Sequence, residues 1–577
     1  MNVVYKHFQH VRDGTWRLKT YIPPTILITG NPGTGKSWLI HSISDVATTV
    51  MDLDEPIKIS FMGIAAININ GFTINSLFDI PVEINLGLGD LKCIKPWDPD
   101  KLIEFKNRYD MNNISAIIID EISMVKPWML AYLDERMKEA TQNYEKPFGG
   151  VALIMVGDFD QQPPIGGSSL PHLSMVLLEK EYQRQHHIYH TNDSAKTKRE
   201  IESSLSRRGV KIFQQAMHLK LTEQYRCAQD PVHMANLTKM NMGESITPKD
   251  LELYKTLSLS DTKNKDSFLH STIVVSGNYE RQEINNFIVQ LWAQHYKTHV
   301  IRWKRKIKYG KWKGMPHSEE ELANAETQAC FWECFVPRAP SYINYNLCTL
   351  NDLANGTPCV VDSLAFDSVE DKLHLDNMLQ HTAIGGTITL PAPPTAINVE
   401  LYPSMPDDDE SARQWKLKKR NEWSRGSIVD DGRVIIPIDK KTPRYQTESI
   451  RSGPLPFHYN ASTVPIGDHF PIDLGFCITI AKAQGRTLSR LILSLSEHPQ
   501  AFLRFTWEQV YAALSRIRAH EFLALLLYMG NRQTLTYLSH LKKDPYTASY
   551  FAGFVAGTTS ESYWNREQAA RAAGFTT

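Results

Sequence analysis

Residues 25–40 read TILITGNPGTGKSWLI, and this stretch decides the fold. An apolar run at 26–28 leads into a loop of the form G-x-x-x-x-G-K-S, and a second apolar segment follows. This order predicts a buried strand, a glycine-rich loop and the start of a helix. Glycines let successive backbone N–H groups point at phosphate oxygens, and the helix start adds the positive end of its dipole. A glycine-rich turn that matches by chance is the alternative, but the flanking apolar runs favour a nucleoside triphosphate site.

The loop supplies the residues expected to bind the nucleotide, ATP, and its Mg²⁺ ion. Lys36 is expected to reach the β- and γ-phosphates, and the Ser37 hydroxyl is expected to hold Mg²⁺. The complete set of predicted nucleotide contacts from this loop is Gly30, Asn31, Pro32, Gly33, Thr34, Gly35, Lys36 and Ser37.

Composition is typical of a soluble globular protein. The chain has 577 residues, enough for several domains, with 42% hydrophobic and 22% charged residues and a net charge of zero. No global positive field indicates nucleic acid, although a local basic channel is compatible with this balance. Among the seven cysteines, Cys330 and Cys334 are the closest pair; reduced core thiols are favoured there over a zinc site. No signal peptide or membrane-spanning run is visible, which predicts a soluble protein in a reducing compartment.

Residues 114–124, ISAIIIDEISM, predict a second element of the site. Four apolar residues ending in Asp120 and Glu121 indicate a buried parallel strand with carboxylates at its C-terminal end. Asp120 is expected to hold the Mg²⁺ that Ser37 also binds, and Glu121 to orient or deprotonate the attacking water. A solvated acidic turn is the alternative, and it would be the default without the phosphate loop upstream.

The next segments continue a strand–helix alternation. A helix is expected over 128–141, a strand over 151–156, and then the turn GDFDQQPP at 157–164, in which Gln161 can sit against the γ-phosphate. A short strand at 57–62 precedes small and hydroxyl residues that suit close approach to a ligand backbone. This alternation predicts a RecA-like parallel sheet.

Several motifs resemble the Pif-type DNA helicases of superfamily one, group B, a family that includes the helicase portion of Helitron transposons. The motifs are DEISM, LDER at 133–136, PFGG at 147–150, GDFDQQPP, TEQYR at 222–226, IVVSGNYERQEIN at 273–285, NGT at 355–357, TIAKAQGRTL at 479–488 and YAALSR at 511–516. They occur in the family's order along most of the chain.

The resemblance implies an α/β fold with two RecA-like domains, a small wedge insertion and a β-barrel insertion similar to Src-homology-three domains. We therefore expect a first RecA-like domain at 1–205 with the wedge at 79–110, and a second at 206–357 and 471–530. The inserted barrel is expected at 358–470, where Pro, Thr, Val and Ile with turn signals also indicate β structure, and a C-terminal tail at 531–577.

The resemblance also implies residue roles. Arg226 and Arg516 would act from the second domain as arginine fingers, and Gly485 would contact the nucleotide. The implied DNA contacts are Gly63, Thr73 and Ser76 on the first domain and Thr479, Lys482 and Gln484 on the second.

This chain departs from the family at several positions. Residues 1–24 contain no convincing counterpart of the Gln-containing segment that reads adenine, so preference for ATP is less secure than triphosphate binding. Met62 replaces a usual Thr, Asn75 a usual His, and Ala481 and Ala483 replace two polar residues expected near DNA.

Two basic stretches have open interpretations. RWKRKIKYGKWK at 302–313 interleaves cations with Trp303, Tyr309 and Trp312, as single-strand binding requires, but a solvated basic hairpin or helix is equally compatible. A similar run at 413–425 beside DDDE at 407–410 is more typical of a charged loop.

The leading functional hypothesis is an ATP-dependent DNA helicase that translocates 5′ to 3′, acting as a monomer on single-stranded DNA and 5′-tailed duplexes. One alternative is a P-loop ATPase switch or remodeller without a grip on nucleic acid; another is a degenerate transposon-derived remnant that binds DNA without unwinding it. An intracellular location is expected, nuclear in a eukaryote with the mitochondrion as an alternative, and no membrane association.

Overall fold

The structure is a computed structural model of the chain. It describes residues 1–577 except 85–93, 187–193, 259–264, 306–330, 349–352, 405–409, 424–426, 429–431, 442–446, 451–461, 466–467, 496–504, 528–536, 558–560 and 576–577. Two compact units are present, and three separate stretches form the first: Met1–Ile246, Thr506–Ser515 and His540–Thr577. The second unit consists of Thr247–Phe505 and Arg516–Ser539.

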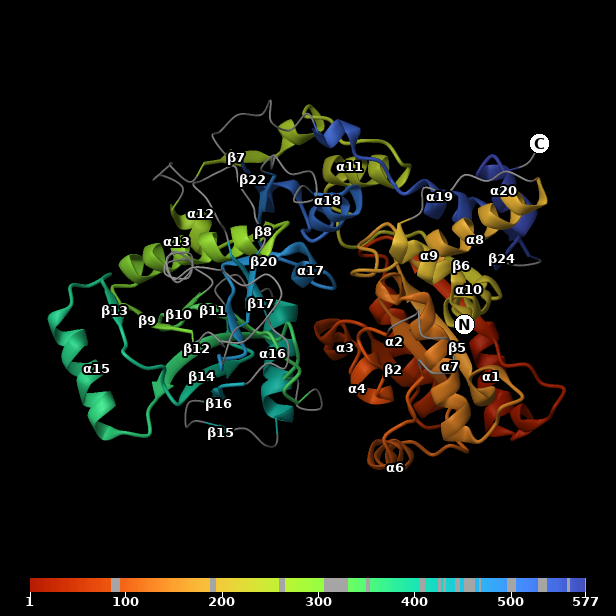
Figure 1. Ribbon diagram of the computed structural model, residues 1–577, viewed down its shortest axis with the longest axis horizontal. Helices are drawn as coiled ribbons and strands as arrows, with labels where there is room; N and C mark the ends of the chain where they lie inside the picture. The colour runs from red at the N-terminus through yellow and green to blue at the C-terminus, as the bar shows by residue number, and fades with distance from the viewer. Residues whose placement is uncertain are drawn as a thin grey trace. The chain divides into compact units, whose positions relative to one another are not determined.

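The first unit is built on an eight-stranded sheet in the order β23-β24-β6-β1-β5-β4-β2-β3 (Figure 1). The strands from β6 to β3 are parallel, β24 is antiparallel to β6, and β23 is antiparallel to β24. β5 separates β1 from β4, so the C-terminal ends of these three strands lie side by side at one edge of the sheet. The bounds are β1 Thr25–Gly30, β2 Ile57–Ser60, β3 Phe72–Thr73, β4 Ala116–Asp120, β5 Ala152–Gly157, β6 Met217–Leu221, β23 Phe554–Ala556 and β24 Ser562–Trp564.

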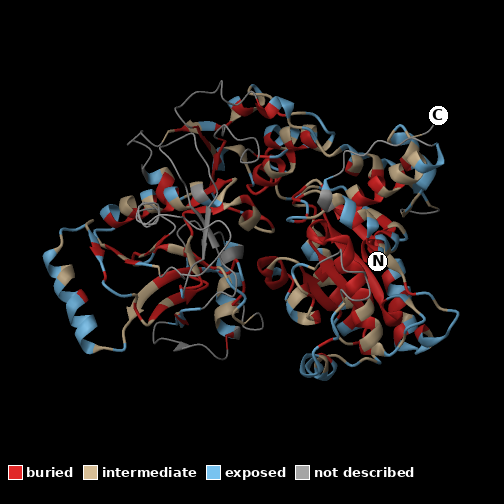
Figure 2. Cartoon of the chain, viewed as in Figure 1, coloured by how far each residue is buried: buried red, intermediate tan, exposed pale blue. Residues whose placement is uncertain are grey.

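Alternate residues of the central strands pack into two separate cores, one on each face of the sheet. In β1, Ile26 and Ile28 face a core shared with α1 and α2, whereas Leu27 faces a core shared with α7, α8 and α10. Burial on both faces explains why these strands are continuous apolar runs (Figure 2). The helices of this unit are α1 Asn2–Arg12, α2 Lys36–Asp45, α3 Gly63–Asn68, α4 Ile74–Phe78, α6 Pro99–Arg108, α7 Pro127–Thr141, α8 Leu170–Gln185, α9 Ala195–Glu202, α10 Ser204–Gln214, α11 Pro231–Asn241, α18 Trp507–Leu514, α19 Pro545–Ala552 and α20 Arg566–Ala572.

The C-terminal segment, residues 540–577, is part of the first unit rather than a separate tail. Its two strands extend the sheet beyond β6, and its helices α19 and α20 pack against α8. Tyr550 on α19 is fully buried and its ring stacks between Phe213 and Trp564, with centroid distances of 5.1 and 5.3 Å. The two strands were not expected from the sequence.

The stretch 206–246 also lies in the first unit, although the sequence placed it in the second domain. The reason is that β6 pairs in parallel with β1, residue by residue from Ile26 opposite Met217 to Gly30 opposite Leu221. The predicted boundary at 205/206 therefore falls within a continuous folded unit, and the correction matters for Arg226, which follows β6.

The second unit has its own five-stranded parallel sheet, in the order β20-β8-β21-β22-β7. Together with the first sheet it confirms the expected α/β class with two RecA-like domains. The bounds are β7 Lys255–Leu257, β8 Thr272–Val275, β20 Cys477–Thr479, β21 Leu491–Ser494 and β22 Leu523–Leu526, with helices α12 Lys265–Leu269, α13 Asn278–His295 and α17 Ile480–Ala483.

The remainder of the second unit is rich in β structure. A six-stranded sheet has the order β15-β16-β14-β12-β11-β19, and smaller sheets have the orders β10-β9-β13 and β17-β18. Closure into the expected barrel stays a prediction. The bounds are β9 Val300–Lys304, β10 Trp332–Phe335, β11 Pro340–Ile343, β12 Pro358–Ala365, β13 Thr387–Thr389, β14 Ala396–Leu401, β15 Ser427–Ile428, β16 Val434–Asp439, β17 Thr447–Ile450, β18 Ser462–Pro465 and β19 Ile472–Leu474, with helices α15 Val369–His381 and α16 Glu410–Glu422.

Candidate nucleoside triphosphate site

The glycine-rich loop between β1 and α2 has the backbone of an anion site. Gly33 and Gly35 have φ angles of +85° and +83°, a region that side chains other than glycine rarely adopt. Helix α2 begins at Lys36, and Gly35 at its N-cap supplies no side-chain cap to the first turn. The N–H groups of that turn thus remain available to a phosphate, which the helix dipole also favours.

Lys36 lies over the loop and close to several carboxylates. Its Nζ donates to the carbonyl oxygens of Gly30 at 2.7 Å and Asn31 at 3.0 Å. Burial lowers the pKa of the Lys36 ammonium, and three nearby carboxylates oppose this shift. In decreasing order of effect they belong to Asp158, Glu121 and Asp120. The structure therefore brings the loop lysine and the predicted acidic pair to the same edge of the sheet.

Asp120 and Glu121 form a tight acidic turn at the end of β4. The Glu121 N–H donates to Asp120 Oδ1 at 2.9 Å. Burial and the neighbouring Glu121 raise the pKa of Asp120 to about 7. Glu121 itself adopts a left-handed conformation with φ of +53°, which costs on the order of 1–3 kcal/mol for a residue other than glycine.

Gly157 at the end of β5 permits this turn to approach. A Cβ atom there would lie 2.9 Å from Ile122 Cγ2 and 3.0 Å from the Ile122 nitrogen. The missing side chain lets the acidic turn pack directly against β5.

The turn after β5 holds Gln161 through Asp158. Gln161 Nε2 donates to Asp158 Oδ2 at 3.0 Å, and the Gln161 N–H donates to the Asp158 carbonyl at 3.2 Å. Both residues are buried. The sequence singled out Gln161 but missed Asp158, although an acidic residue directly after a buried strand was the same signal that identified Asp120.

The loop at 222–226 lies against the phosphate loop. The Tyr225 N–H donates to the Gly33 carbonyl at 2.9 Å, and Gln224 Nε2 donates to the Pro32 carbonyl at 2.5 Å. A Cβ atom on Gly33 would lie 2.4 Å from Arg226 Cβ, so Arg226 stands beside the loop within the first unit. Its guanidinium Nη1 donates to the Ser515 carbonyl at 2.9 Å. Gln224 and Tyr225 were missed because backbone contacts of this kind leave no trace in a sequence pattern.

Arg516 and Gly485 belong to the second unit. Arg516 is buried, its Nη1 donates to the Arg486 carbonyl at 3.5 Å, and its own carbonyl accepts from the Leu488 N–H at 2.8 Å. Gly485 has φ of +74°. The structure thus joins Arg516 to the 485–488 turn, and their roles toward the nucleotide stay predictions.

The DNA contacts predicted in the first unit lie near the ends of β2 and β3. Gly63 begins α3, and Thr73 caps α4 by accepting from the Ser76 N–H at 3.3 Å. The Thr73 hydroxyl also donates to Ser76 Oγ at 2.7 Å. Thr73 is buried and Ser76 is exposed, so Ser76 presents the accessible hydroxyl.

The DNA contacts predicted in the second unit lie at the end of β20. Thr479 ends that strand, and Lys482 and Gln484 follow on and after α17. Lys482 Nζ pairs with Asp473 Oδ2 at 2.7 Å, and Asp473 also pairs with Arg281 at 3.1 Å. Although burial raises it, the pKa of Asp473 lies below its ordinary value because these two cations are close.

The basic stretch at 302–313 is described only as far as residue 305. Trp303 is 1% exposed and its Nε1 donates to Glu333 Oε2 at 2.7 Å, so the idea that this ring stacks on bases is wrong. Residues 306–313 and the acidic residues 407–409 lie outside the described part of the chain.

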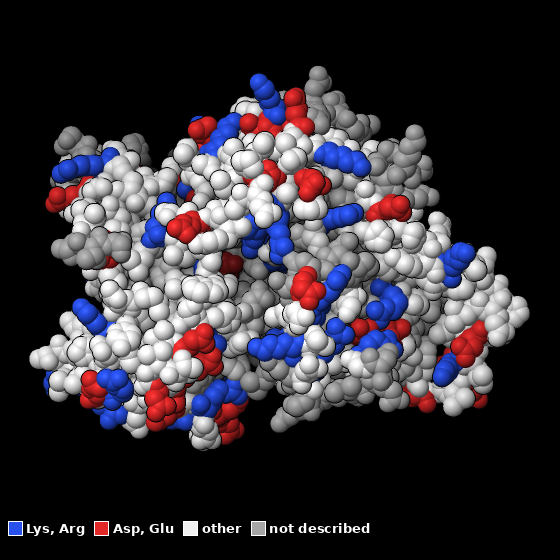
Figure 3. Space-filling model, turned by 180° about the vertical axis from the view of Figure 1, so that it is seen from behind, with Lys and Arg blue, Asp and Glu red and all other residues white. Residues whose placement is uncertain are grey.

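The described residues contain no cluster of three His, Cys, Asp or Glu side chains that could hold a metal ion by itself. Burial raises the pKa of the Cys334 thiol to about 11, as expected of a reduced core cysteine, while Cys330 lies outside the described residues. Among the helices that the structure describes, none is both long and apolar enough to cross a membrane. Figure 3 shows Lys and Arg interspersed with Asp and Glu on one face, consistent with the zero net charge.

A phosphate loop between β1 and α2, carboxylates after β4 and a second parallel sheet define a P-loop fold with RecA-like domains. Residues 13–230 match the family model of the PIF1-like helicases. The resemblance noted in the sequence is thereby confirmed.

Named relatives agree over the same region. ATP-dependent DNA helicase PIF1 of Saccharomyces cerevisiae is 36% identical over 145 residues, which cover 24% of this chain and 15% of that protein. ATP-dependent DNA helicase Pif1 of Psychrobacter sp. is 32% identical over 149 residues, covering 24% of this chain and 20% of that protein. The matched segments thus span a fifth or less of these relatives.

The likeness of fold extends further. The crystal structure of Pif1 helicase from Candida albicans superposes with a TM-score of 0.51 at 18% identity, covering 94% of this chain and 97% of that one. At this identity the comparison concerns the fold alone.

Proposed function

We propose that this chain is an ATP-dependent DNA helicase that translocates 5′ to 3′ on single-stranded DNA and unwinds duplexes during replication, repair, recombination or telomere maintenance. The observation that carries the proposal is the meeting of the phosphate loop, the acidic turn, the Gln161 turn and Arg226 at one edge of the first sheet. The match to the PIF1-like helicase model and the similarity to named ATP-dependent DNA helicases support the proposal that ATP hydrolysis is coupled to DNA.

The proposed chemistry is phosphoryl transfer to water, which depends mainly on positioning and charge stabilisation. Lys36 and the loop N–H groups would bind the phosphates. Glu121 would orient the attacking water and accept its proton, and Gln161 would hold its place through Asp158. Arg226 would stabilise negative charge on the transferring phosphoryl group from within the first unit. Arg516 would stabilise the same charge from the second unit.

The residues present fit a magnesium ion bound together with the nucleotide. The pKa of Asp120 is raised to about 7 by burial and by Glu121, so a cation at this carboxylate would favour its ionised form. Asp120 and the Ser37 hydroxyl would hold the ion, which when bound neutralises charge on the β- and γ-phosphate oxygens.

The proposed partners are single-stranded DNA and 5′-tailed duplexes, bound by a monomer. Gly63, Thr73 and Ser76 would contact the strand from the first unit, and Thr479, Lys482 and Gln484 from the second. Lys482 would have to exchange or share its pairing with Asp473, which makes its contribution to DNA affinity smaller than that of a free lysine. A nuclear location in a eukaryote, or a mitochondrial one, fits this role.

Hydrolysis of ATP measured with and without single-stranded DNA tests the proposal. A helicase should hydrolyse ATP slowly alone and many times faster with DNA. An ATPase switch that never grips nucleic acid would hydrolyse at a rate that DNA leaves unchanged, and a degenerate remnant would bind DNA but hydrolyse poorly. Either of the last two results would overturn the proposed function.

A further inference from the structure

The C-terminal segment contacts the turn that carries Gln161. Lys543 Nζ lies 2.5 Å from Oδ1 of Asp160, the residue directly before Gln161. The two side chains are only 18% and 15% exposed. The segment's first residues are therefore joined to the turn by an ion pair that is largely withdrawn from water.

Within the turn, Asp158 accepts hydrogen bonds from Asp160 and Gln161. The Asp160 N–H donates to Asp158 Oδ1 at 3.0 Å, and both the backbone and side-chain N–H groups of Gln161 donate to Asp158. These bonds set the shape of the turn.

A pocket of about 270 Å³ lies beside the turn and leaves that side without close packing. Gln161, Ser123, Lys543 and Asp544 are among its lining residues. On this side the Gln161 side chain borders open space rather than closely packed side chains. The position of the turn therefore depends more on its polar contacts. The ion pair between Asp160 and Lys543 is one of these contacts, in the C-terminal half of the turn.

The charge of Asp160 depends on Lys543. Burial and the nearby Asp158 raise the pKa of Asp160 to about 6; Lys543, and less strongly Lys220, oppose this shift. Removing one partner of a buried pair leaves an uncompensated charge, which must then take up a proton or move toward water. Either response would shift the turn.

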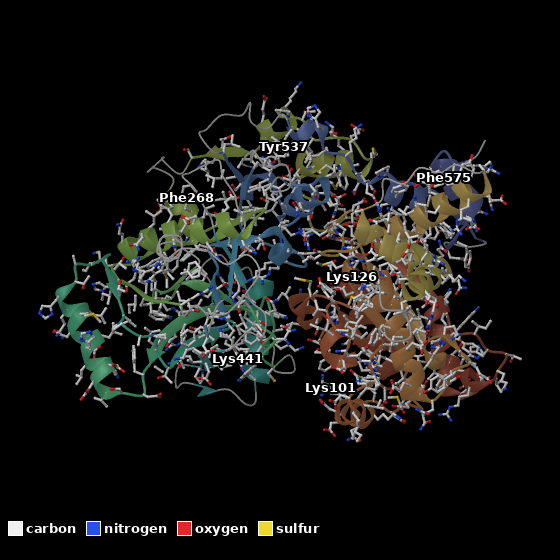
Figure 4. All side chains as sticks on the ribbon, viewed as in Figure 1. Lys101, Lys126, Phe268, Lys441, Tyr537 and Phe575 are labelled. Atoms are coloured by element: carbon white, nitrogen blue, oxygen red, sulfur yellow. The ribbon has the colours of Figure 1, made fainter. Side chains whose placement is uncertain are left out.

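The segment itself is anchored independently of Lys543. The fully buried Tyr550 on α19 stacks on Phe213 and Trp564, and the ring of Phe575, labelled in Figure 4, stacks with Tyr182 at 6.2 Å. Changing Lys543 would therefore release the turn without releasing the segment.

We propose that Lys543 is a positioning residue for Gln161, holding the turn through Asp160 so that the Gln161 amide meets the γ-phosphate. The inference rests on the proposed ATP hydrolysis. It assigns the C-terminal segment a part in the turnover step rather than in nucleotide binding.

The test is DNA-stimulated ATP hydrolysis by the full chain, with Lys543→Met keeping the alkyl stem and removing the charge. We expect kcat to fall about tenfold while KM for ATP stays within about twofold, because displacement of a group that acts in the transition state lowers kcat. Lys543→Arg should retain most of the wild-type kcat, and Asp160→Asn should reproduce the loss. The double variant should be no slower than either single one, because both changes break the same interaction.

The matched control is Arg566→Ala, which breaks an exposed ion pair of the same segment with Glu181 and should leave kcat and KM unchanged. Unchanged kcat in Lys543→Met, an equal loss in Lys543→Arg, or a rise in KM instead would overturn the inference. If Lys543→Met does not fold, judged by its thermal unfolding, the near-isosteric Asp160→Asn decides in the same way. A wild-type chain that does not hydrolyse ATP would overturn the proposed function itself and this inference with it.

Discussion

At the scale of single residues, the site is defined by one buried ammonium among three carboxylates. Lys36 is surrounded by Asp158, Glu121 and Asp120, and its pKa reflects burial opposed by all three. Such a group is placed to hold phosphate charge rather than to stabilise the fold.

We expect Lys36→Ala to abolish ATP hydrolysis while leaving single-stranded DNA binding largely intact, since the predicted DNA contacts involve other residues. ATP hydrolysis and DNA affinity, measured on the same preparation, check this. Hydrolysis within tenfold of wild type, equivalent to only about 1.4 kcal/mol of barrier, would contradict the assignment.

Glu121 carries backbone strain at the same site, with φ of +53°. Glu121→Gly should raise the free energy of unfolding by about 1 kcal/mol, because glycine adopts this conformation without strain, and should collapse turnover by removing the carboxylate. Denaturant unfolding and kcat measure the two effects. Gln142, the exposed left-handed residue that ends α7 with φ of +55°, is the control. Gln142→Gly should stabilise similarly without changing kcat; loss of stability in Glu121→Gly would show that the strain is offset by contacts of the side chain.

At the scale of elements, β6 joins the phosphate-loop strand to the C-terminal hairpin of β23 and β24. His218 on β6 lies 2.7 Å from Thr29 Oγ1 through Nε2 and 3.3 Å from Ser562 Oγ through Nδ1. It therefore links three strands at the centre of this half of the sheet.

Burial, together with a smaller effect of Lys220, lowers the pKa of His218 from 6.5 to about 4. The unfolded chain thus binds the extra proton more readily, so this group's contribution to stability is complete above pH 6.5 and is lost as the pH falls toward 4. Between pH 7 and pH 5 the loss should be about 2 kcal/mol. Denaturant unfolding of wild type and His218→Gln at both pH values checks this; an equal acid loss in the two proteins would refute it.

The packing of α19 depends on one ring. Tyr550→Ala should lower the free energy of unfolding by about 3–5 kcal/mol, the usual cost of deleting a fully buried aromatic side chain. The Tyr550 hydroxyl is buried without a hydrogen-bond partner in the described structure. Tyr550→Phe should therefore be neutral or stabilising in the same measurement, and a large loss in that control would reveal a partner for the hydroxyl.

The sequence predicted those elements whose local pattern is strong. The strands β1, β4 and β5 are continuous apolar runs, and each is followed directly by the residues of the site. A single stretch of sequence therefore predicts both the strand and the functional residues after it. β23 and β24 have three residues each, too few for a periodic signal, and β24 pairs with β6 far away in the sequence. The position of Arg226 was misjudged for a related reason: motif order along a chain does not say which sheet a strand joins. Partners such as Lys543 and Asp160 become visible only in three dimensions.

At the scale of the whole molecule, the direction of movement is the property that the ATPase core does not decide. We expect translocation 5′ to 3′, because NGT at 355–357, the β-rich insertion and TIAKAQG at 479–485 resemble the Pif-type group. A partial duplex with a 5′ single-stranded tail should be unwound, and one with only a 3′ tail should not. Affinity should fall steeply with salt, because phosphate contacts release counterions, and base sequence should matter little. Preferential unwinding of the 3′-tailed substrate would refute the group assignment and leave the triphosphatase core standing.

The first unit's division into three stretches has a consequence for synthesis on the ribosome. β6 ends at Leu221, but β24, the strand that pairs with its outer edge, begins only at Ser562 and is made much later. At about 5–20 residues per second, the roughly 340 residues between these two strands take on the order of 15–70 seconds to translate. Throughout that interval the outer edge of β6 in the first unit has no partner strand, and an exposed strand edge can pair with another chain and cause aggregation. Because the first unit is assembled from stretches that lie far apart in the chain, its sheet edge must be protected from other chains until β24 has been made.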